Sequence, residues 1–200
     1  MRYNTNKIQW CPGCWNYLNH IAIKQALAEL KIPAKDTVVI TGIGCNSKMS
    51  QYLEWYWAES LHWRSIPFAT GVKLSNPKLT VISLSWDWDT YWIWIWHLIH
   101  AARRNIPILH ITCDNENYAL TTGQASATTP IWVKTKSTPE GNNLEPLHPI
   151  NSVEKCGCTF IKSIPGNDLN LMKETIKSAI QHDWFSHINI QQACPSRKRW

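Results

Sequence analysis

The chain has 200 residues and a net charge of +6. This length suits one domain with a single buried core, and we expect one domain over residues 1–200. The positive charge is spread along the chain apart from residues 197–199, so it indicates acidic partners only weakly and gives no nucleic-acid footprint. We expect neither a membrane span nor a signal peptide, because no long apolar stretch and no basic segment followed by an apolar run occurs. A cytoplasmic location follows as an expectation.

The amino-terminal part of the chain carries a Cys-x-x-Cys turn. Cys11 and Cys14 enclose a Pro-Gly pair, which points both sulfurs at one place. Such a turn is typical of half a zinc site, half an iron–sulfur site or a redox pair. The seven cysteines of a chain expected in the cytoplasm favour metal or cluster ligation over disulfides. A helix is predicted next, over residues 17–30, from apolar residues at helical spacing.

A short apolar strand over residues 37–40 leads into a glycine-containing loop. Gly42 and Gly44 allow the backbone to approach another group closely, and a third cysteine, Cys45, follows them.

The stretch from Thr80 to Gln124 organises the rest of the chain. It predicts a strand, an acidic turn with Asp87, a helix over residues 90–105, a second strand over 107–113, and an amide-rich turn with Asn115. A right-handed crossover of this kind places both turns at the carboxyl ends of parallel strands. Asp87 and Asn115 then offer oxygen ligands suited to a hard divalent cation. The alternative is a solvated pair of turn residues.

The last third of the chain predicts a loop and three further elements. Residues 137–143 form the loop by composition, and residues 159–161 form a strand. A helix over residues 169–180 and a strand over residues 188–190 follow, and that strand leads to Cys194.

Several motifs then point to one family. They read, in chain order, WCPGC, TGIGCNSK, SIPFATGVKLSNPKLTVI, HLIHAARRNI, DNENYALTTGQASATTP and QQACP. Together they resemble the β subunit of 2-oxoacid:ferredoxin oxidoreductases over almost the whole chain. The resemblance implies an α/β thiamine-diphosphate-binding fold, with a mostly parallel sheet and helices on both faces. Because β subunits of this family usually continue further, we expect residue 200 to be a C-terminal truncation.

The resemblance also implies an activity and its partners. The family oxidatively decarboxylates a 2-oxoacid, of the 2-oxoglutarate or pyruvate type, to acyl-CoA and CO₂, and electrons pass through an iron–sulfur cluster to ferredoxin. An α subunit is implied, in a heterodimer or heterotetramer, and the residue that activates the aminopyrimidine is expected from it. The cofactors implied are thiamine diphosphate, Mg²⁺ and one 4Fe-4S cluster.

The site residues follow from the same resemblance. Cys11, Cys14, Cys45 and Cys194 would hold the cluster, while Asp87, Asn115 and the carbonyl of Asn117 would bind Mg²⁺. Lys48 would pair with the substrate carboxylate, unless it is a solvated lysine, and His62 would contact the cofactor. The other implied cofactor contacts are Ile43, Gly44, Cys45, Asn46, Trp88, Asp89, Ala119 and Leu120. Cys113, Cys156 and Cys158 are interpreted as packing residues.

Tryptophan is the departure from the family pattern, with thirteen residues against eight glycines. Tryptophan stands at family glycine positions 15, 55, 57, 63, 86, 88, 92, 94, 96, 132 and 184. Our hypothesis is that a stop codon read as glycine in some bacteria has been translated here as tryptophan. If the indoles are real, we expect poor folding and no cofactor binding, because large-for-small replacements cost roughly 1–3 kcal/mol each.

Two other functions remain open from the sequence. One is a thiamine-dependent decarboxylase or synthase without a cluster, and the other is a zinc-binding interaction module. Iron content separates the first from the proposed family, and zinc content identifies the second.

Overall fold

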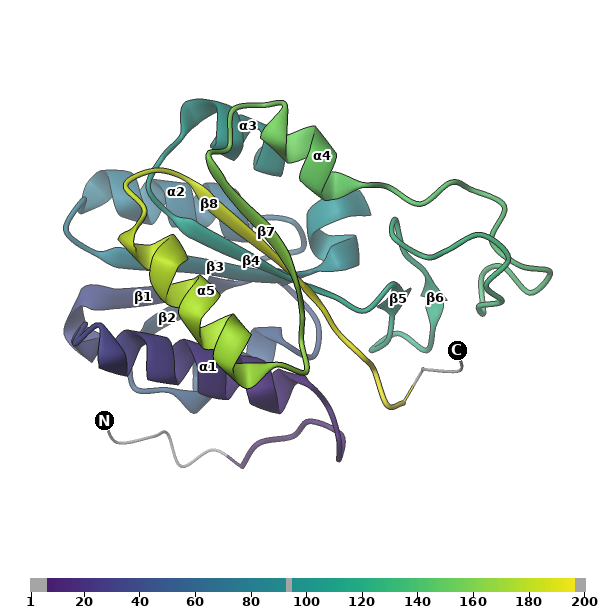
Figure 1. The fold of residues 1–200 in the computed structure, drawn as a ribbon. Coiled ribbons are helices and arrows are strands. Elements are labelled where there is room, and N and C mark those ends of the chain that lie inside the picture. Colours follow the sequence, from purple (N-terminus) through teal and green to yellow (C-terminus); the bar gives the residue numbers. More distant parts are fainter. Residues whose placement is uncertain (1–6, 93–94, 197–200) are drawn as a thin grey trace.

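A six-stranded parallel sheet forms the middle layer of the molecule (Figure 1). The computed structural model of the chain describes residues 7–92 and 95–196. The sheet order is β2-β1-β3-β4-β8-β7, and every neighbouring pair is parallel. The strands are β1 (Thr37–Thr41), β2 (Tyr56–Glu59), β3 (Thr80–Trp86), β4 (Leu109–Asp114), β7 (Phe160–Pro165) and β8 (Ser186–Gln191).

Helices cover both faces of the sheet (Figure 1). On one face, α1 (Asn16–Glu29) packs beside α5 (Leu169–Gln181). On the other, α2 (Ser65–Ser75) neighbours α3 (Ile95–Arg104), which neighbours α4 (Pro149–Glu154). The predicted α/β class, with a mostly parallel sheet between two helical layers, is therefore confirmed.

The strand side chains alternate between two apolar cores. In β1, Val39 joins the core under α1 and α5, whereas Val38 and Ile40 join the core under α2 and α3. Because both faces are covered, the central strands are buried on both sides, and β1 is a continuous run of β-branched residues. The other central strands β3, β4 and β8 also bury polar side chains, including Ser83, Ser85, His110, Thr112, His187 and Asn189.

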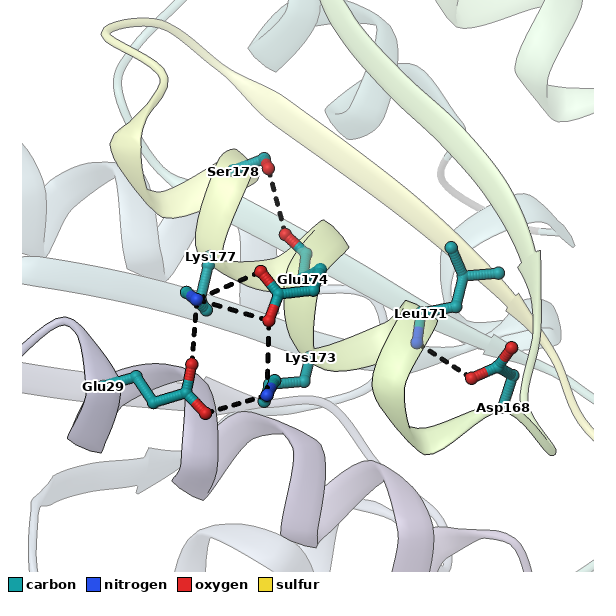
Figure 2. A network of polar contacts seen from close by, with 7 residues as sticks. All are labelled: Glu29, Asp168, Leu171, Lys173, Glu174, Lys177 and Ser178. Atoms are coloured by element: carbon teal, nitrogen blue, oxygen red, sulfur yellow. Dashed lines mark hydrogen bonds and ion pairs between the residues drawn. The ribbon is translucent and has the colours of Figure 1, made fainter.

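A polar network on the surface connects the two helices of the first face (Figure 2). The Glu29 carboxylate of α1 accepts hydrogen bonds from Nζ of Lys173 and Nζ of Lys177, each at 2.8 Å, and Glu174 contacts both lysines. Asp168 caps the start of α5 by accepting a 2.9 Å hydrogen bond from the backbone N–H of Leu171. These groups are exposed to solvent, so the apolar core provides most of the stabilisation of this helix pair.

Most of the predicted elements are present within one to three residues, but the central helix differs. In place of one helix over residues 90–105, a π-helical turn spans Trp88–Trp92 and α3 begins at Ile95. Position 94, which was predicted to be helical and to correspond to a family glycine, lies outside the described residues. The elements β2, α2 and α4 were not predicted from the sequence. β2 is an edge strand with largely exposed side chains, so it lacks the buried apolar run by which a strand is predicted.

Short elements complete the fold. The 3-10 helices are η1 (Ala34–Asp36) and η2 (Ser47–Tyr52), and a small hairpin pairs β5 (Asn117–Tyr118) with β6 (Gln124–Ala125). The loop predicted over residues 137–143 is confirmed. Within residues 7–92 and 95–196, no helix has the length and apolar character needed to cross a membrane.

Candidate cofactor and cluster site

The predicted functional segments meet at one edge of the sheet. Because the strands are parallel, the loops after β1, β3, β4 and β8 all leave from the carboxyl edge. These loops carry Cys45, Asp87, Asn115 and Cys194. The topology therefore brings together residues that are far apart in the chain.

The four predicted cluster cysteines line a single cavity of about 240 Å³. Lys48, Trp86, Ala119 and Leu120, from the segments predicted to bind cofactor and substrate, line the same cavity. Within the part of the chain that the structure describes, no three His, Cys, Asp or Glu side chains are arranged to hold a metal ion. The fold thus gathers the four thiols around one space without directing them at a common point.

Trp10 connects the amino-terminal cysteine turn to the loop after β1. Its indole N–H donates a 2.6 Å hydrogen bond to the carbonyl of Cys45. The Tyr17 hydroxyl donates to the carbonyl of Trp10 at 3.2 Å, and the turn itself closes through Cys14 N–H donating to the Cys11 carbonyl at 3.0 Å. These bonds fix Cys11 and Cys14 relative to Cys45.

Gln192 performs the same task for the carboxyl-terminal cysteine. Its amide nitrogen donates to Asn16 Oδ1 at 2.7 Å, and its amide oxygen accepts from Asn19 Nδ2 at 2.7 Å. All three side chains are buried, so this chain of amides anchors the segment that contains Cys194 to the first turn of α1.

The thiol environment disfavours thiolates in the absence of a cation. The pKa of Cys14 is raised to about 11, mainly by burial and to a smaller extent by the neighbouring Cys194, Cys45 and Cys11, against an opposing backbone hydrogen bond from Asn16. Burial also raises the pKa of Cys45, partly offset by Lys48. Four clustered sulfurs of this kind fit an iron–sulfur cluster or a zinc ion, whose positive charge stabilises the thiolates.

Asp87 is buried directly after β3 with one oxygen unused. Its Oδ2 accepts hydrogen bonds from the hydroxyls of Ser126 and Thr128, whereas its Oδ1 has no hydrogen-bond partner among the described residues. Burial and the nearby Asp114 carboxylate raise the pKa of Asp87 well above its usual value. An unpaired carboxylate oxygen in this environment fits a hard divalent cation such as Mg²⁺.

The turn after β4 supplies the other two predicted magnesium ligands. Asn115 is buried, and its Oδ1 accepts a hydrogen bond from the backbone N–H of Asn117 at 3.2 Å. The Asn117 carbonyl accepts from the backbone N–H of Ala119 at 3.0 Å, which leaves its second lone pair for another partner. Asn115 Nδ2 and Asn117 Oδ1 are buried without a partner among the described residues.

Asp89, a predicted diphosphate contact, connects two loops of the site. It accepts hydrogen bonds from the backbone N–H groups of Trp63 at 2.7 Å and Ile43 at 3.4 Å. His62 Nδ1 lies 3.6 Å from Asp89 Oδ1. The structure therefore places His62, Ile43 and Asp89 together, and the carboxylate serves here as a backbone anchor.

Two buried indoles fill the space between these loops. Trp88 stacks on Tyr118, with ring centroids 4.6 Å apart, and its centroid lies 4.9 Å from that of His62. Trp86 covers the open side of Gly44, since a Cβ on Gly44 would lie 2.4 Å from Cδ1 of Trp86. The unpaired Asp87 Oδ1 fits a cation, but indole rings fill the space beside Gly44 and at position 88, where the resemblance predicts cofactor contacts.

The remaining predicted residues have less specific surroundings. Asn46 is buried, and Leu120 is exposed. Lys48 Nζ donates to Gln9 Oε1 at 2.9 Å while it lines the cysteine cavity. Cys113 and Cys158 are buried, as the packing interpretation expects.

The residues that hold the predicted ligands in place by hydrogen bonds were not predicted from the sequence. Thr128 Oγ1 donates to Asp114 Oδ1 at 2.7 Å as well as to Asp87, so it joins the two carboxylates. Ser126 and Thr128 lie in the motif that ends in ATTP, and Gln192 lies in QQACP. Their presence in these motifs is the sequence signal that could have identified them, but which residues they contact depends on the fold.

Known proteins agree with this architecture. Residues 42–190 match the thiamine pyrophosphate enzyme family, C-terminal TPP binding domain. The β subunit of a 2-oxoacid:ferredoxin oxidoreductase from Sulfolobus sp is 41% identical over 189 residues, which are 94% of this chain and 62% of that protein. The 2-oxoglutarate synthase subunit KorB of Archaeoglobus fulgidus is 33% identical over 95% of this chain and 71% of that protein.

A solved structure has the same fold. The 2-oxoglutarate:ferredoxin oxidoreductase from Magnetococcus marinus, with 2-oxoglutarate, coenzyme A and succinyl-CoA bound, superposes with a TM-score of 0.96 at 31% identity. The superposition covers 98% of this chain and 68% of that one.

The parallel sheet, the loop geometry and the matched residues define a thiamine-diphosphate-binding domain. Within that class, the chain belongs to the family of 2-oxoacid:ferredoxin oxidoreductase β subunits. It spans 62% of the length of the Sulfolobus relative.

Proposed function

We propose that this chain is the cofactor- and cluster-binding part of an enzyme that oxidatively decarboxylates a 2-oxoacid, 2-oxoglutarate or pyruvate, to acyl-CoA and CO₂. It works with an α subunit and coenzyme A, and electrons leave through the cluster to ferredoxin. The relatives' names and the 2-oxoglutarate and coenzyme A bound in the solved neighbour support the substrate class.

One observation carries the proposal. The cavity lined by the four cysteines is bounded by Trp86, and the next residue is Asp87, the buried carboxylate with an unpaired oxygen. A sulfur-rich site and a cation site therefore adjoin at the same sheet edge. An enzyme that removes electrons from a cofactor-bound substrate one at a time needs this adjacency.

We assign roles to individual residues from the family resemblance, and their positions at the sheet edge support the assignment. Cys11, Cys14, Cys45 and Cys194 hold a 4Fe-4S cluster. Asp87, Asn115 and the carbonyl of Asn117 bind the Mg²⁺ that holds thiamine diphosphate, which, when bound, supplies the electron sink for decarboxylation.

The residue assigned to the substrate, Lys48, lines the cysteine cavity. Lys48 presents an ammonium group beside Ala119 and Leu120 and pairs with the carboxylate of the 2-oxoacid. His62, held 3.6 Å from Asp89, contacts the cofactor. Ile43, Gly44 and Asn46 line the thiamine ring, and positions 88 and 89 contact its diphosphate.

Anaerobic reconstitution with iron and sulfide tests the cluster separately from the thiamine site. We expect one 4Fe-4S cluster per chain by iron and sulfide analysis and by electron paramagnetic resonance after reduction. Serine at position 11, 14, 45 or 194 should reduce the iron content, whereas the control Cys156→Ser should not. Zinc in place of iron would favour the interaction module, and thiamine diphosphate binding without iron would favour a decarboxylase.

Activity is then measured on the complex with the α subunit. Ferredoxin reduction that depends on both a 2-oxoacid and coenzyme A is the expected result. A complex that contains its cluster and thiamine diphosphate but reduces no ferredoxin with either 2-oxoacid would contradict the proposal.

A further inference from the structure

We propose that positions 63, 86, 88 and 132 carry glycine in the functional protein, and that indoles at positions 86 and 88 close its cofactor site. The second part rests on the proposed function, since it concerns thiamine diphosphate. The first part rests on backbone conformation at positions 63 and 132, and on indoles that fill the space beside the predicted ligand loops at positions 86 and 88. Tryptophan stands at eleven family glycine positions, and the proposal selects the four at which the backbone conformation or the surroundings of the side chain are unsuited to an indole.

Positions 86 and 88 are opposed by what surrounds them. Trp86 and Trp88 are 4% and 5% exposed, so both indoles lie inside the molecule at the edge where the ligand loops converge. Gly44 has φ of +115°, and Cδ1 of Trp86 takes the place that a Cβ at Gly44 would need. A glycine-containing loop of this kind leaves room for a group other than protein, and here that room is filled by a side chain of the neighbouring strand.

The indole at position 88 also competes with the cation site. Trp88 directly follows Asp87, whose Oδ1 is buried and unpaired. The indole of Trp88 packs against His62 and stacks on Tyr118. His62 is a predicted cofactor contact, and Tyr118 directly precedes two others, Ala119 and Leu120. A glycine at position 88 removes this ring and opens a path from the carboxylate to His62.

Positions 63 and 132 are opposed by the backbone. Trp63 has φ of +63° and Trp132 has φ of +67°, in the left-handed region that is strained for bulky residues. Lys31, Asn105, Glu116 and Thr122 also have positive φ, but none of them is aromatic. Lys31 and Asn105 follow helix C-termini, where this conformation is common. Trp63 and Trp132 lie in turns, which favour glycine for this conformation.

Trp10 provides an internal comparison. It is buried, its indole N–H is hydrogen-bonded to Cys45, and its ring packs edge-on against Tyr17 and Tyr52. The indole N–H groups of Trp63 and Trp55, in contrast, are buried without a hydrogen-bond partner among the described residues, and of these two only Trp63 also has a positive φ. A tryptophan that belongs to its fold satisfies its N–H when buried. Trp10 meets this condition and Trp63 does not.

The glycine assignment does not extend to four tryptophans whose side chains are exposed. Trp57, Trp92, Trp96 and Trp184 are each more than two-fifths exposed, and none has a positive φ. The fold accepts either residue there, so these positions are outside the proposal and serve as controls.

Peptide mass spectrometry of the protein isolated from its source cells, together with its coding DNA, tests the first part. We expect glycine at positions 63, 86, 88 and 132, encoded by a reassigned stop codon, and tryptophan at position 10, encoded by TGG. Tryptophan in the peptides at any of the four positions, or TGG codons at them, would overturn the assignment. This test does not depend on whether a variant folds.

Thiamine diphosphate content tests the second part, measured on the complex with the α subunit after copurification with Mg²⁺. The double variant Trp86→Gly/Trp88→Gly should retain the cofactor, whereas the printed sequence and the control Trp57→Gly/Trp184→Gly should lose it. Retention by the printed sequence would overturn the proposed closure. If peptides show glycine at all four positions but the quadruple variant Trp63→Gly/Trp86→Gly/Trp88→Gly/Trp132→Gly still lacks the cofactor, the proposed function fails while the glycine assignment stands.

Discussion

The indole N–H of Trp10 and the carbonyl of Cys45 are joined by a 2.6 Å hydrogen bond across 35 positions of the chain. The donor precedes the turn that carries Cys11 and Cys14, and the acceptor is itself a predicted cluster ligand. One buried ring therefore fixes the relative positions of three of the four cysteines. This relationship gives the cluster site its most direct structural test.

Replacing Trp10 by Phe should loosen the cysteine site. The change leaves the Cys45 carbonyl without its donor, and an unpaired buried group costs about 1–3 kcal/mol in free energy of unfolding. We expect a loss of that size in urea unfolding and a lower iron content after reconstitution. The control Trp184→Phe changes an exposed ring and should stay within about 0.5 kcal/mol. Equal iron content in Trp10→Phe and the parent would contradict the positioning role.

Replacing Gln192 by Leu should release the carboxyl-terminal cysteine segment. The substitution leaves buried Asn16 Oδ1 without its donor and removes the oxygen acceptor of Asn19 Nδ2, which keeps only Cys113 Sγ, and we expect a cost of about 2–3 kcal/mol. Urea unfolding and cluster content are the measurements. Gln191→Leu is the matched control, because the adjacent Gln191 side chain is exposed. A similar loss in both variants would show that the amide chain has no special role.

Asp87→Asn should separate the cost of the buried carboxylate from its metal binding. Burial raises the pKa of Asp87, so the folded state keeps the proton longer than the unfolded state and loses stability as pH rises through the folded pKa. The amide cannot ionise, and the metal-free variant should be at least as stable as the parent at neutral pH. Mg²⁺ should raise the melting temperature of the parent only. The exposed Asp183→Asn is the control, and an equal Mg²⁺ effect in Asp87→Asn would exclude Asp87 as a ligand.

His187 should make the fold sensitive to acid. It is buried in β8, hydrogen-bonded to Tyr91 at 3.0 Å and stacked on His110, and burial lowers its pKa from 6.5 to about 3. Between these values only the unfolded state binds the proton, so stability falls on acidification by up to ~1.4 kcal/mol per pH unit. His187→Gln should reduce the slope of unfolding free energy against pH by that amount. Parallel slopes in the two proteins would contradict this.

The secondary structure was predictable where side-chain periodicity is strong. β1 is a continuous run of β-branched residues, β3, β4 and β8 each contain several buried apolar residues, and α5 shows its apolar stripe clearly. β2 was not predictable because it is an exposed edge strand. The π-helical turn at Trp88–Trp92, where an ordinary helix was expected from residue 90, was also not predicted.

The candidate site was predictable in its members and not in its contacts. The motifs identified Asp87 and the four cysteines, and the structure places the cysteines around one cavity. Ser126 and Thr128, which hydrogen-bond to Asp87, reach it from the loop that follows β6. Their roles as well as the ligand assignments remain predictions that the experiments above decide.

The sequence by itself determined the α/β class, the family and the identity of the candidate ligands, because these depend on local periodicity and on motifs whose residue types suit one chemistry. Only the tertiary structure decided which side chains meet, since the parallel register brings loops that are distant along the chain to one sheet edge. It also decided which tryptophans matter. An indole is costly only where the backbone is left-handed or the surrounding space is needed, and these are properties of the folded chain.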